Sequence, residues 1–193
     1  MANRFKSSII EGYLNADSVL LTGTTHSVRT MNANEVCLSS NCELICVNGF
    51  NLVKFPNGGS VGEEGVISFV KSLPPSYLEG TDIKMSIRWV SPTVFPGNVV
   101  WTMSYSWVNC GESITPLTAM ANLGANPENS LEVTSTKFTD ISGVGKLKRS
   151  LIFGKLERKS SLSSYDTYNN DVYLIEVCIG FQIYSLGDPE FIP

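Results

Sequence analysis

Charged residues are scarce in this chain. Of its 193 residues, 17% are Asp, Glu, Lys or Arg, and the 14 basic residues are outnumbered by 18 acidic ones. The net charge of −4 and the pI near 5.0 argue against a nucleic-acid partner, because phosphate binding requires clustered Lys and Arg. The densest basic run, GKLKRS at 145–150, alternates its charges and is interpreted as the solvent face of a strand.

Long apolar runs are also missing. No stretch approaches the roughly 20 consecutive apolar residues that a membrane helix needs, so no membrane partner is expected. The segment MANRFKSSII at 1–10 lacks the apolar core of a signal peptide. The five cysteines are an odd number. We therefore expect a chain made in a reducing cytoplasm, with free and mostly buried thiols.

Helical periodicity is weak, whereas a period of two is clear in three segments: DIKMSIRWV (82–90), GNVVWTMSYSW (97–107) and DVYLIEVCIGFQIYS (171–185). Each segment places its large apolar side chains on one face, which must be covered by another sheet, another subunit or a ligand. We expect a facing sheet to cover most of them. The predicted core contains Trp89, Trp101, Met103, Ile175, Val177 and Ile179.

Seven or eight such strands with turn signals between them are typical of a β-sandwich or barrel. The prediction is an all-β, jelly-roll-like antiparallel β-sandwich over residues 36–193, preceded by an N-terminal arm and lead-in over residues 1–35. A Pro-Gly turn predicts that 82–90 and 97–107 form an antiparallel pair. Residues 35–55 are expected to form a hairpin, with breaks at 39–41 and at Asn48-Gly49, and 117–123 are expected to form one helical turn.

Motifs that resemble catalytic or metal sites do not assemble. GGSVG at 58–62 matches a nucleophile elbow around Ser60, but a strand follows it, and the single histidine, His26, precedes it. Cys37, Cys42 and Cys46 are spaced too loosely for zinc knuckles, and Cys42 and Cys46 are expected on one face of a strand as small apolar residues. No catalytic residue, cofactor or metal ligand is therefore assigned.

Three stretches together resemble a family of small β-sandwich virion proteins of tailed bacteriophages: LPPSYLEGTDIKMSIRWV (73–90), GNVVWTMSYSWVN (97–109) and LIEVCIGFQIYSLGD (174–188). Members of that family often have histidines just before the closing Trp. This chain has Ser86, Ile87 and Arg88 there, so no role of those histidines carries over.

The resemblance implies a virion structural protein made in the bacterial cytoplasm and placed on the capsid surface. The leading hypothesis is a capsid decoration (cement) protein, a homotrimer whose partners are itself and the major capsid protein. The alternative is a receptor- or glycan-binding module of a tail or neck fibre, which would have a host receptor. A glycan-cleaving enzyme is the third hypothesis, because paired carboxylates can hydrolyse sugars.

The N-terminal arm has large apolar residues without strand alternation, which predicts burial against a partner. The alternative is that the arm folds back on its own subunit as an edge strand. The predicted interface residues are Arg4, Phe5, Ile9, Ile10, Tyr13, Trp107 and Phe191.

Overall fold

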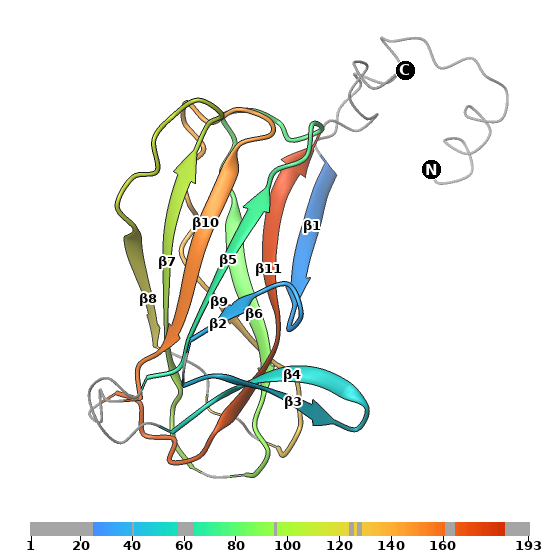
Figure 1. Cartoon of the computed structure of the whole chain (residues 1–193), viewed down its shortest axis with the longest axis vertical. Helices are drawn as coiled ribbons and strands as arrows, with labels where there is room; N and C mark the ends of the chain where they lie inside the picture. Colours follow the sequence, from blue (N-terminus) through green and yellow to red (C-terminus); the bar gives the residue numbers. More distant parts are fainter. Residues whose placement is uncertain are drawn as a thin grey trace, which may run out of the picture.

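Two antiparallel β-sheets pack face to face (Figure 1). The structure is a computed structural model, and it describes residues 25–39, 41–57, 64–94, 96–123, 126, 129–160 and 165–183. Every regular element within these residues is a strand, and every strand pair is antiparallel. The predicted jelly-roll-like antiparallel β-sandwich is confirmed.

Sheet A has six strands. Its spatial order is β3 (Glu43–Val47), β4 (Phe50–Phe55), β11 (Val172–Ile183), β6 (Lys84–Val90) and β9 (Thr134–Lys137), with β1 (Thr25–Asn32) also paired to β11. Sheet B has the order β2 (Cys37–Leu38), β5 (Val66–Ser72), β10 (Leu151–Arg158), β7 (Val100–Val108) and β8 (Thr118–Leu123). No helix in the described ranges is long and apolar enough to cross a membrane.

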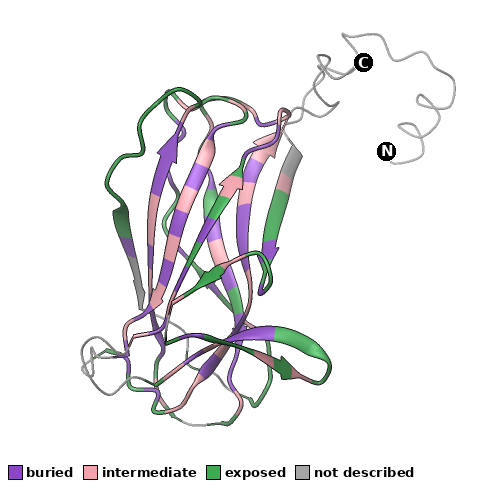
Figure 2. Cartoon of the chain, in the orientation of Figure 1, coloured by how far each residue is buried: buried purple, intermediate pink, exposed green. Residues whose placement is uncertain are grey.

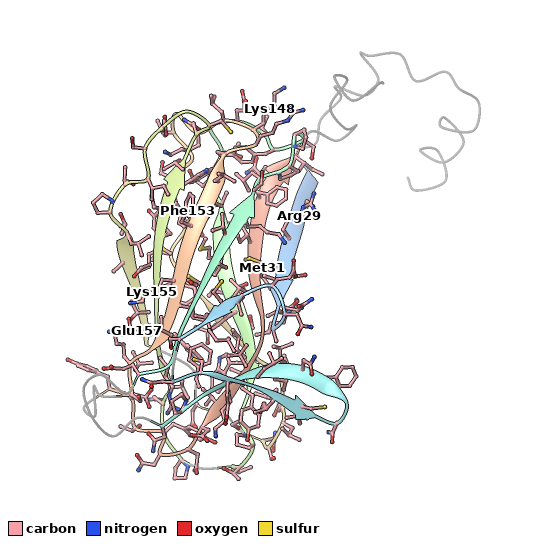
Figure 3. All side chains as sticks on the ribbon, in the orientation of Figure 1. Arg29, Met31, Lys148, Phe153, Lys155 and Glu157 are labelled. Carbon is pink, nitrogen blue, oxygen red and sulfur yellow. The ribbon has the colours of Figure 1, made fainter. Side chains whose placement is uncertain are left out.

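The strand faces that carry the large apolar side chains meet between the two sheets. Trp89 of β6 and Trp101 of β7 are fully buried, and their ring centroids lie 6.0 Å apart across the core. Five of the six predicted core residues are buried here, and the facing sheet covers the aromatic row of β7 as expected. The outer face of β10 is mixed, with the apolar residues Leu151 and Phe153 followed by Lys155 and Glu157 (Figure 3).

Three sequence-based expectations about strands are wrong. Strands β6 and β7 do not pair; they lie in different sheets and contact through their side chains. Residues 117–123 form no helical turn, because 118–123 pair with β7 as the edge strand β8, and this pairing outweighs a weak local preference. The run at 145–150 is a loop, and β10 begins after it.

The expected hairpin is present but shorter. Strands β3 and β4 form it around Asn48 and Gly49, whereas β2 leaves for sheet B, where it pairs with β5. Cys42 lies just before β3 and is buried, while Cys46 within β3 is exposed, so the two thiols do not share a face. Strand β1 falls within residues 1–35 and is part of sheet A, where it pairs with β11 along its whole length.

Strand β11 contains a β-bulge that the sequence pattern did not reveal. The pairing with β6 shifts between Leu174 and Glu176, so Ile175 is an extra residue. Leu174 faces the core before the bulge, and Val177 and Ile179 face it afterwards. The strict alternation predicted for this strand is therefore wrong, and Ile175 is only partly buried, outside the core.

A buried ion pair joins the two sheets at one end of the sandwich. Arg158, the last residue of β10, is completely buried and donates to both carboxylate oxygens of Asp166, at 3.1 and 3.0 Å. Its guanidinium also donates to the main-chain oxygens of Pro56, Tyr168 and Asn170. Because these partners lie after β4 in sheet A and before β11, one side chain fixes both chain segments to β10.

Asp166→Asn is expected to lower the free energy of unfolding by about 3–5 kcal/mol, because it leaves the buried Arg158 charge without its counter-ion. Urea unfolding followed by tryptophan fluorescence measures this loss. The matched control is Glu43→Gln, which weakens the more exposed Lys54–Glu43 pair and should cost less than about 1 kcal/mol. Equal losses in the two variants would contradict a structural role for Arg158.

None of the five cysteines forms a disulfide, but three of them are exposed, so the expectation of mostly buried thiols is wrong. Burial raises the pKa of Cys42 to about 11, and burial, reinforced by the nearby Glu176 carboxylate, raises the pKa of Cys178. Both thiols are therefore poorly accessible and protonated near neutral pH, whereas the thiolate is the form that reacts.

Iodoacetamide labelling of the native protein at pH 7.5 should modify three cysteines, Cys37, Cys46 and Cys110, which are the exposed ones. Labelling of the unreduced, denatured protein should modify all five, as intact mass measures. A shortfall of two after denaturation would reveal a disulfide. Rapid native labelling at Cys178 would contradict its burial in sheet A.

Candidate functional site

The bulge at Ile175 lies where one edge of β11 changes partner. Strand β4 pairs with residues 172–174 of β11, and β1 pairs with the same edge from Glu176 to Ile183. Strand β1 ends there, at Asn32, while the β3–β4 hairpin extends sideways beyond it (Figure 1). The interrupted edge leaves a groove between the end of β1 and the hairpin.

This hairpin groove encloses about 620 Å³ and has no ionisable lining residue. Four of its lining residues are amides, Asn32, Asn34, Asn48 and Asn51. Seven are apolar, Val47, Phe50, Leu52, Val90, Leu131, Val133 and Ile175, and the twelfth is Gly49. A mostly apolar hollow with a few well-placed polar groups is typical of ligand sites in proteins.

Phe50 is the most exposed large apolar side chain of sheet A, at 71% exposure. It follows the two-residue turn at Asn48 and Gly49, whose φ values of 51° and 85° are those of a tight hairpin turn. Together with the other apolar lining residues of the groove, this exposed ring forms an apolar surface that a ligand or partner can cover. The outer end of the hairpin is accordingly exposed in Figure 2.

The hairpin that carries Phe50 is held by ion pairs at its base. Lys54 lies 2.7 Å from a carboxylate oxygen of Glu43 and 3.3 Å from one of Asp171. Hydrogen bonds to these two carboxylates, Glu43 first, raise the pKa of Lys54, so the lysine stays charged throughout the physiological range. The turn and its base therefore position Phe50 at the groove.

Hydrogen bonds link three of the amides that line the groove. The main-chain N–H of Asn34 donates to Oδ1 of Asn32 at 3.0 Å, and Nδ2 of Asn51 donates to Oδ1 of Asn34 at 3.5 Å. Glu35 accepts from the main-chain N–H of Asn32, and its hydrogen bond with Lys71 lowers its pKa. A primary amide offers two donors and one acceptor oxygen, so these contacts leave hydrogen-bonding capacity for a ligand.

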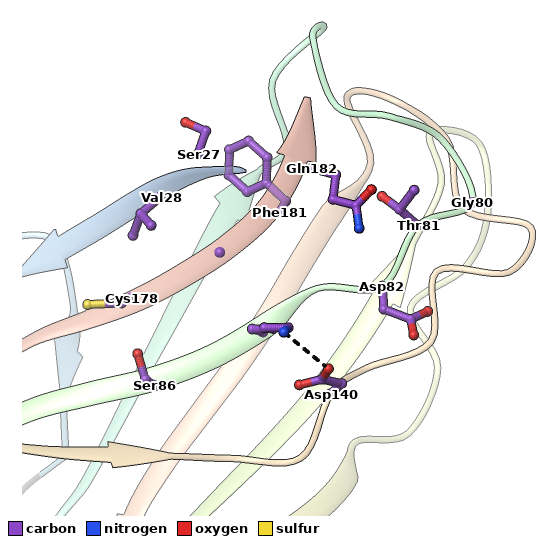
Figure 4. A pocket seen from close by; sticks show the side chains of 12 residues that line it. Ser27, Val28, Gly80, Thr81, Asp82, Ser86, Asp140, Cys178, Phe181 and Gln182 are labelled. Atoms are coloured by element: carbon purple, nitrogen blue, oxygen red, sulfur yellow. Dashed lines mark ion pairs between the residues drawn. The ribbon is translucent and has the colours of Figure 1, made fainter. Parts of the chain in front are cut away.

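A second hollow of about 580 Å³, the sheet trough, lies further along the outer face of sheet A (Figure 4). Ser86, Cys178 and Gly180 are small floor residues from the two central strands, and Val28 of β1 borders it. The remaining lining residues are mostly polar: Ser27, Gly80, Thr81, Asp82, Lys84, Asp140, Phe181 and Gln182.

The charges of the sheet trough are partly paired. Lys84 lies 3.7 Å from Asp140, and both side chains are more than half exposed, so this pair opens readily. Asp82 accepts a hydrogen bond from the main-chain N–H of Gly143 at 3.0 Å, which fixes the carboxylate at the rim. The trough therefore offers hydrogen-bond donors and acceptors side by side.

Of the predicted interface residues, only Trp107 is described, and it lines neither of these two hollows. Arg4, Phe5, Ile9, Ile10, Tyr13 and Phe191 lie outside the described residues. Trp107 is only 4% exposed, and its indole N–H donates to Ser150 Oγ at 2.7 Å within its own chain. The Trp107 side chain is thus buried in the core of its own chain, because the alternation along β7 directs it inward.

The structure brings no catalytic motif together among the described residues. Ser60 falls outside them, and only the main chain of His26 is described, paired with Gln182, a lining residue of the sheet trough. Sequence reasoning missed Phe50 and the asparagines. The available signal was Asn48-Gly49, a strong hairpin turn, followed directly by an aromatic residue that the turn exposes.

No protein-family model and no curated protein sequence matches the chain. Among solved structures, a family 35 carbohydrate-binding module from Clostridium thermocellum is similar, with 9% identity, a TM-score of 0.43, and coverage of 79% of this chain and 97% of that one. The CBM22-2 xylan-binding domain of Paenibacillus barcinonensis Xyn10C has 13% identity, a TM-score of 0.43, and coverage of 78% and 93%.

The Cry4Aa toxin of Bacillus thuringiensis is similar in the same way, with 12% identity and a TM-score of 0.49, over 81% of this chain and 23% of the toxin. At these identities and TM-scores the likeness is one of β-sandwich architecture, and it identifies no site. The chain is an all-β, jelly-roll-like sandwich.

Proposed function

We propose that the chain is a glycan-binding module whose primary site is the hairpin groove. The observation that carries this proposal is Phe50, a ring 71% exposed at a groove lined by four asparagines and by no ionisable residue. This corresponds to the alternative function that the sequence analysis raised, rather than to its leading hypothesis.

The chemistry of the groove matches that of a sugar. A pyranose ring has a face of C–H groups and an edge of hydroxyl groups. The C–H face packs on an aromatic ring such as Phe50, where apolar area is removed from water. Each hydroxyl both donates and accepts a hydrogen bond, and a primary amide such as that of Asn34 or Asn51 supplies both functions.

The absence of charge in the groove selects a neutral glycan. A sulfate or carboxylate on the sugar would lose its hydration without meeting a cation, which is costly. Hydrolysis of a glycosidic bond requires a carboxylic acid and a second carboxylate on either side of it, and the groove lining contains neither. The proposed activity is therefore binding without cleavage at this groove.

Capsid decoration stays a prediction from the sequence resemblance. It depends on an N-terminal arm whose interface residues lie outside the described part of the chain. Glycan binding at the hairpin groove is compatible with a virion location, because no predicted interface residue among those described lines the groove. The two hypotheses are tested by different experiments.

Phe50→Ala should weaken binding to a neutral glycan at least tenfold, about 1.4 kcal/mol, because it removes the stacking surface. Affinity electrophoresis in gels with galactomannan, arabinoxylan, hydroxyethylcellulose or dextran identifies the polysaccharide, and isothermal titration gives the constant. The thermal midpoint should change little, because the side chain is mostly exposed.

The matched control is Tyr165→Ala, which removes another exposed aromatic ring, at 56% exposure, away from the groove. It should leave binding unchanged. The proposal is wrong if the folded wild-type protein is retarded by none of these polysaccharides, or if Phe50→Ala binds as tightly as the wild type.

A further inference from the structure

We propose that the ligand is an extended glycan chain that lies along the outer face of sheet A and fills both the hairpin groove and the sheet trough. This inference rests on the proposed function and adds the shape of the ligand: an internal stretch of a linear polymer, not a single terminal sugar.

The two hollows open on the same face of the same sheet. On β1, Val28 lines the trough and Asn32 lines the groove; on β6, Ser86 lines the trough and Val90 the groove. Residues four apart on a strand point to the same side, since side chains alternate with a period of two. Four strand residues span about 13 Å, so the hollows are close neighbours in one line.

The surface between the hollows is polar and open. Arg88 and Glu176 pair there across β6 and β11, and the Arg88 side chain is 53% exposed. A guanidinium has five N–H donors, so an exposed Arg88 retains donors that can contact the hydroxyls of a chain passing over it. Thr30 of β1, opposite Cys178, is also exposed. The outward-facing residues of β1, β6 and β11 between the hollows, Thr30, Arg88 and Glu176, are all polar.

Gly180 keeps the trough hollow, although neither backbone nor packing requires a glycine there. Its φ is not in the left-handed region, and an added Cβ would meet only the Lys84 carbonyl oxygen at 3.7 Å and Lys84 Cβ at 3.8 Å. These are ordinary contacts. Glycine is unfavourable within a strand, and where packing does not explain it, it often marks close approach of a ligand.

The trough complements the groove chemically. Asp82 and Asp140 supply acceptors at its rim, and Lys84 and Gln182 supply donors. The two carboxylates outnumber the single lysine, so the trough disfavours acidic sugars, as the uncharged groove does. Both hollows thus disfavour an acidic glycan. A ring held in the groove would present the next rings of its chain to the trough at high effective concentration.

Titration of the wild-type protein with manno-, xylo-, cello- and isomalto-oligosaccharides of two to six rings tests this inference. The dissociation constant should fall at least tenfold between the disaccharide and the hexasaccharide of the series that binds. Gly180→Val, which fills the trough with a residue that strands favour, should abolish this gain and leave disaccharide binding unchanged. Gly180→Ala should reduce the increase in affinity with chain length only partly, and it carries less risk to folding.

The control is Ser68→Val, a matched small-to-β-branched change at an exposed position of β5 in sheet B, and it should preserve the whole length dependence. Unchanged hexasaccharide affinity in both Gly180 variants, with normal thermal midpoints, would overturn the extended site. Equal losses for disaccharide and hexasaccharide would also overturn it, because the trough would then be the primary site.

Phe50→Ala separates the two proposals, since it should weaken binding at every chain length. If Phe50→Ala loses binding but Gly180→Val keeps the full length dependence, the hairpin groove remains the site. Only the inference of an extended ligand is then wrong. No effect of Phe50→Ala at any length, or no binding of any series by the wild type, removes the proposed function itself.

Discussion

The buried ion pair between Arg158 and Asp166 is the constraint on which the end of the sandwich depends. The arginine occupies an inward position of β10 that the strand pattern reserves for an apolar residue, and it is completely buried. Its charge is compensated by Asp166 and by three main-chain oxygens, while Asp166 also accepts from the main-chain N–H of Val100 at the start of β7. This one ion pair therefore joins four chain segments: β10, the end of β4, the start of β7 and residues 166–170. Because the segment from 166 to 170 leads directly into β11, this pair also sets where that strand enters sheet A.

The entry point of β11 determines the geometry of its edge. The strand first pairs with β4 and then, beyond the bulge at Ile175, with β1. A bulge and a change of partner at one residue leave main chain and side chains that no neighbouring strand covers. The hairpin groove forms there, with Phe50 presented by a rigid turn. The irregularity in the sheet and the candidate site are thus a single structural feature, in keeping with the frequent occurrence of bulges near functional sites.

The outer face of sheet A differs from that of sheet B in what it offers a ligand. On sheet A, small residues at Ser86, Cys178 and Gly180 lower the surface between polar rims. On sheet B, Ser106 of β7 is buried and shares a hydrogen bond with Thr115 at 2.8 Å, and the hollow that these two residues line is smaller, about 210 Å³. Small residues therefore line a large hollow on sheet A and a smaller one on sheet B, where the Thr115 segment covers Ser106.

The sequence by itself determined the fold class and most of the core. Period-two alternation shows which side chains of a strand must be buried away from water. Trp89, Trp101 and Met103 are on the predicted face, and all three are fully buried. It also located the hairpin turn at Asn48-Gly49, because that turn chemistry is local. Only the tertiary structure decided which strands pair, since β6 and β7 suit either arrangement, and only it revealed the bulge that moves Ile175 out of the core. The candidate site was decided in the same way. Asn32, Phe50, Val90 and Ile175 come from four separate strands, and no local pattern records that a switch of partner along β11 brings them to one groove.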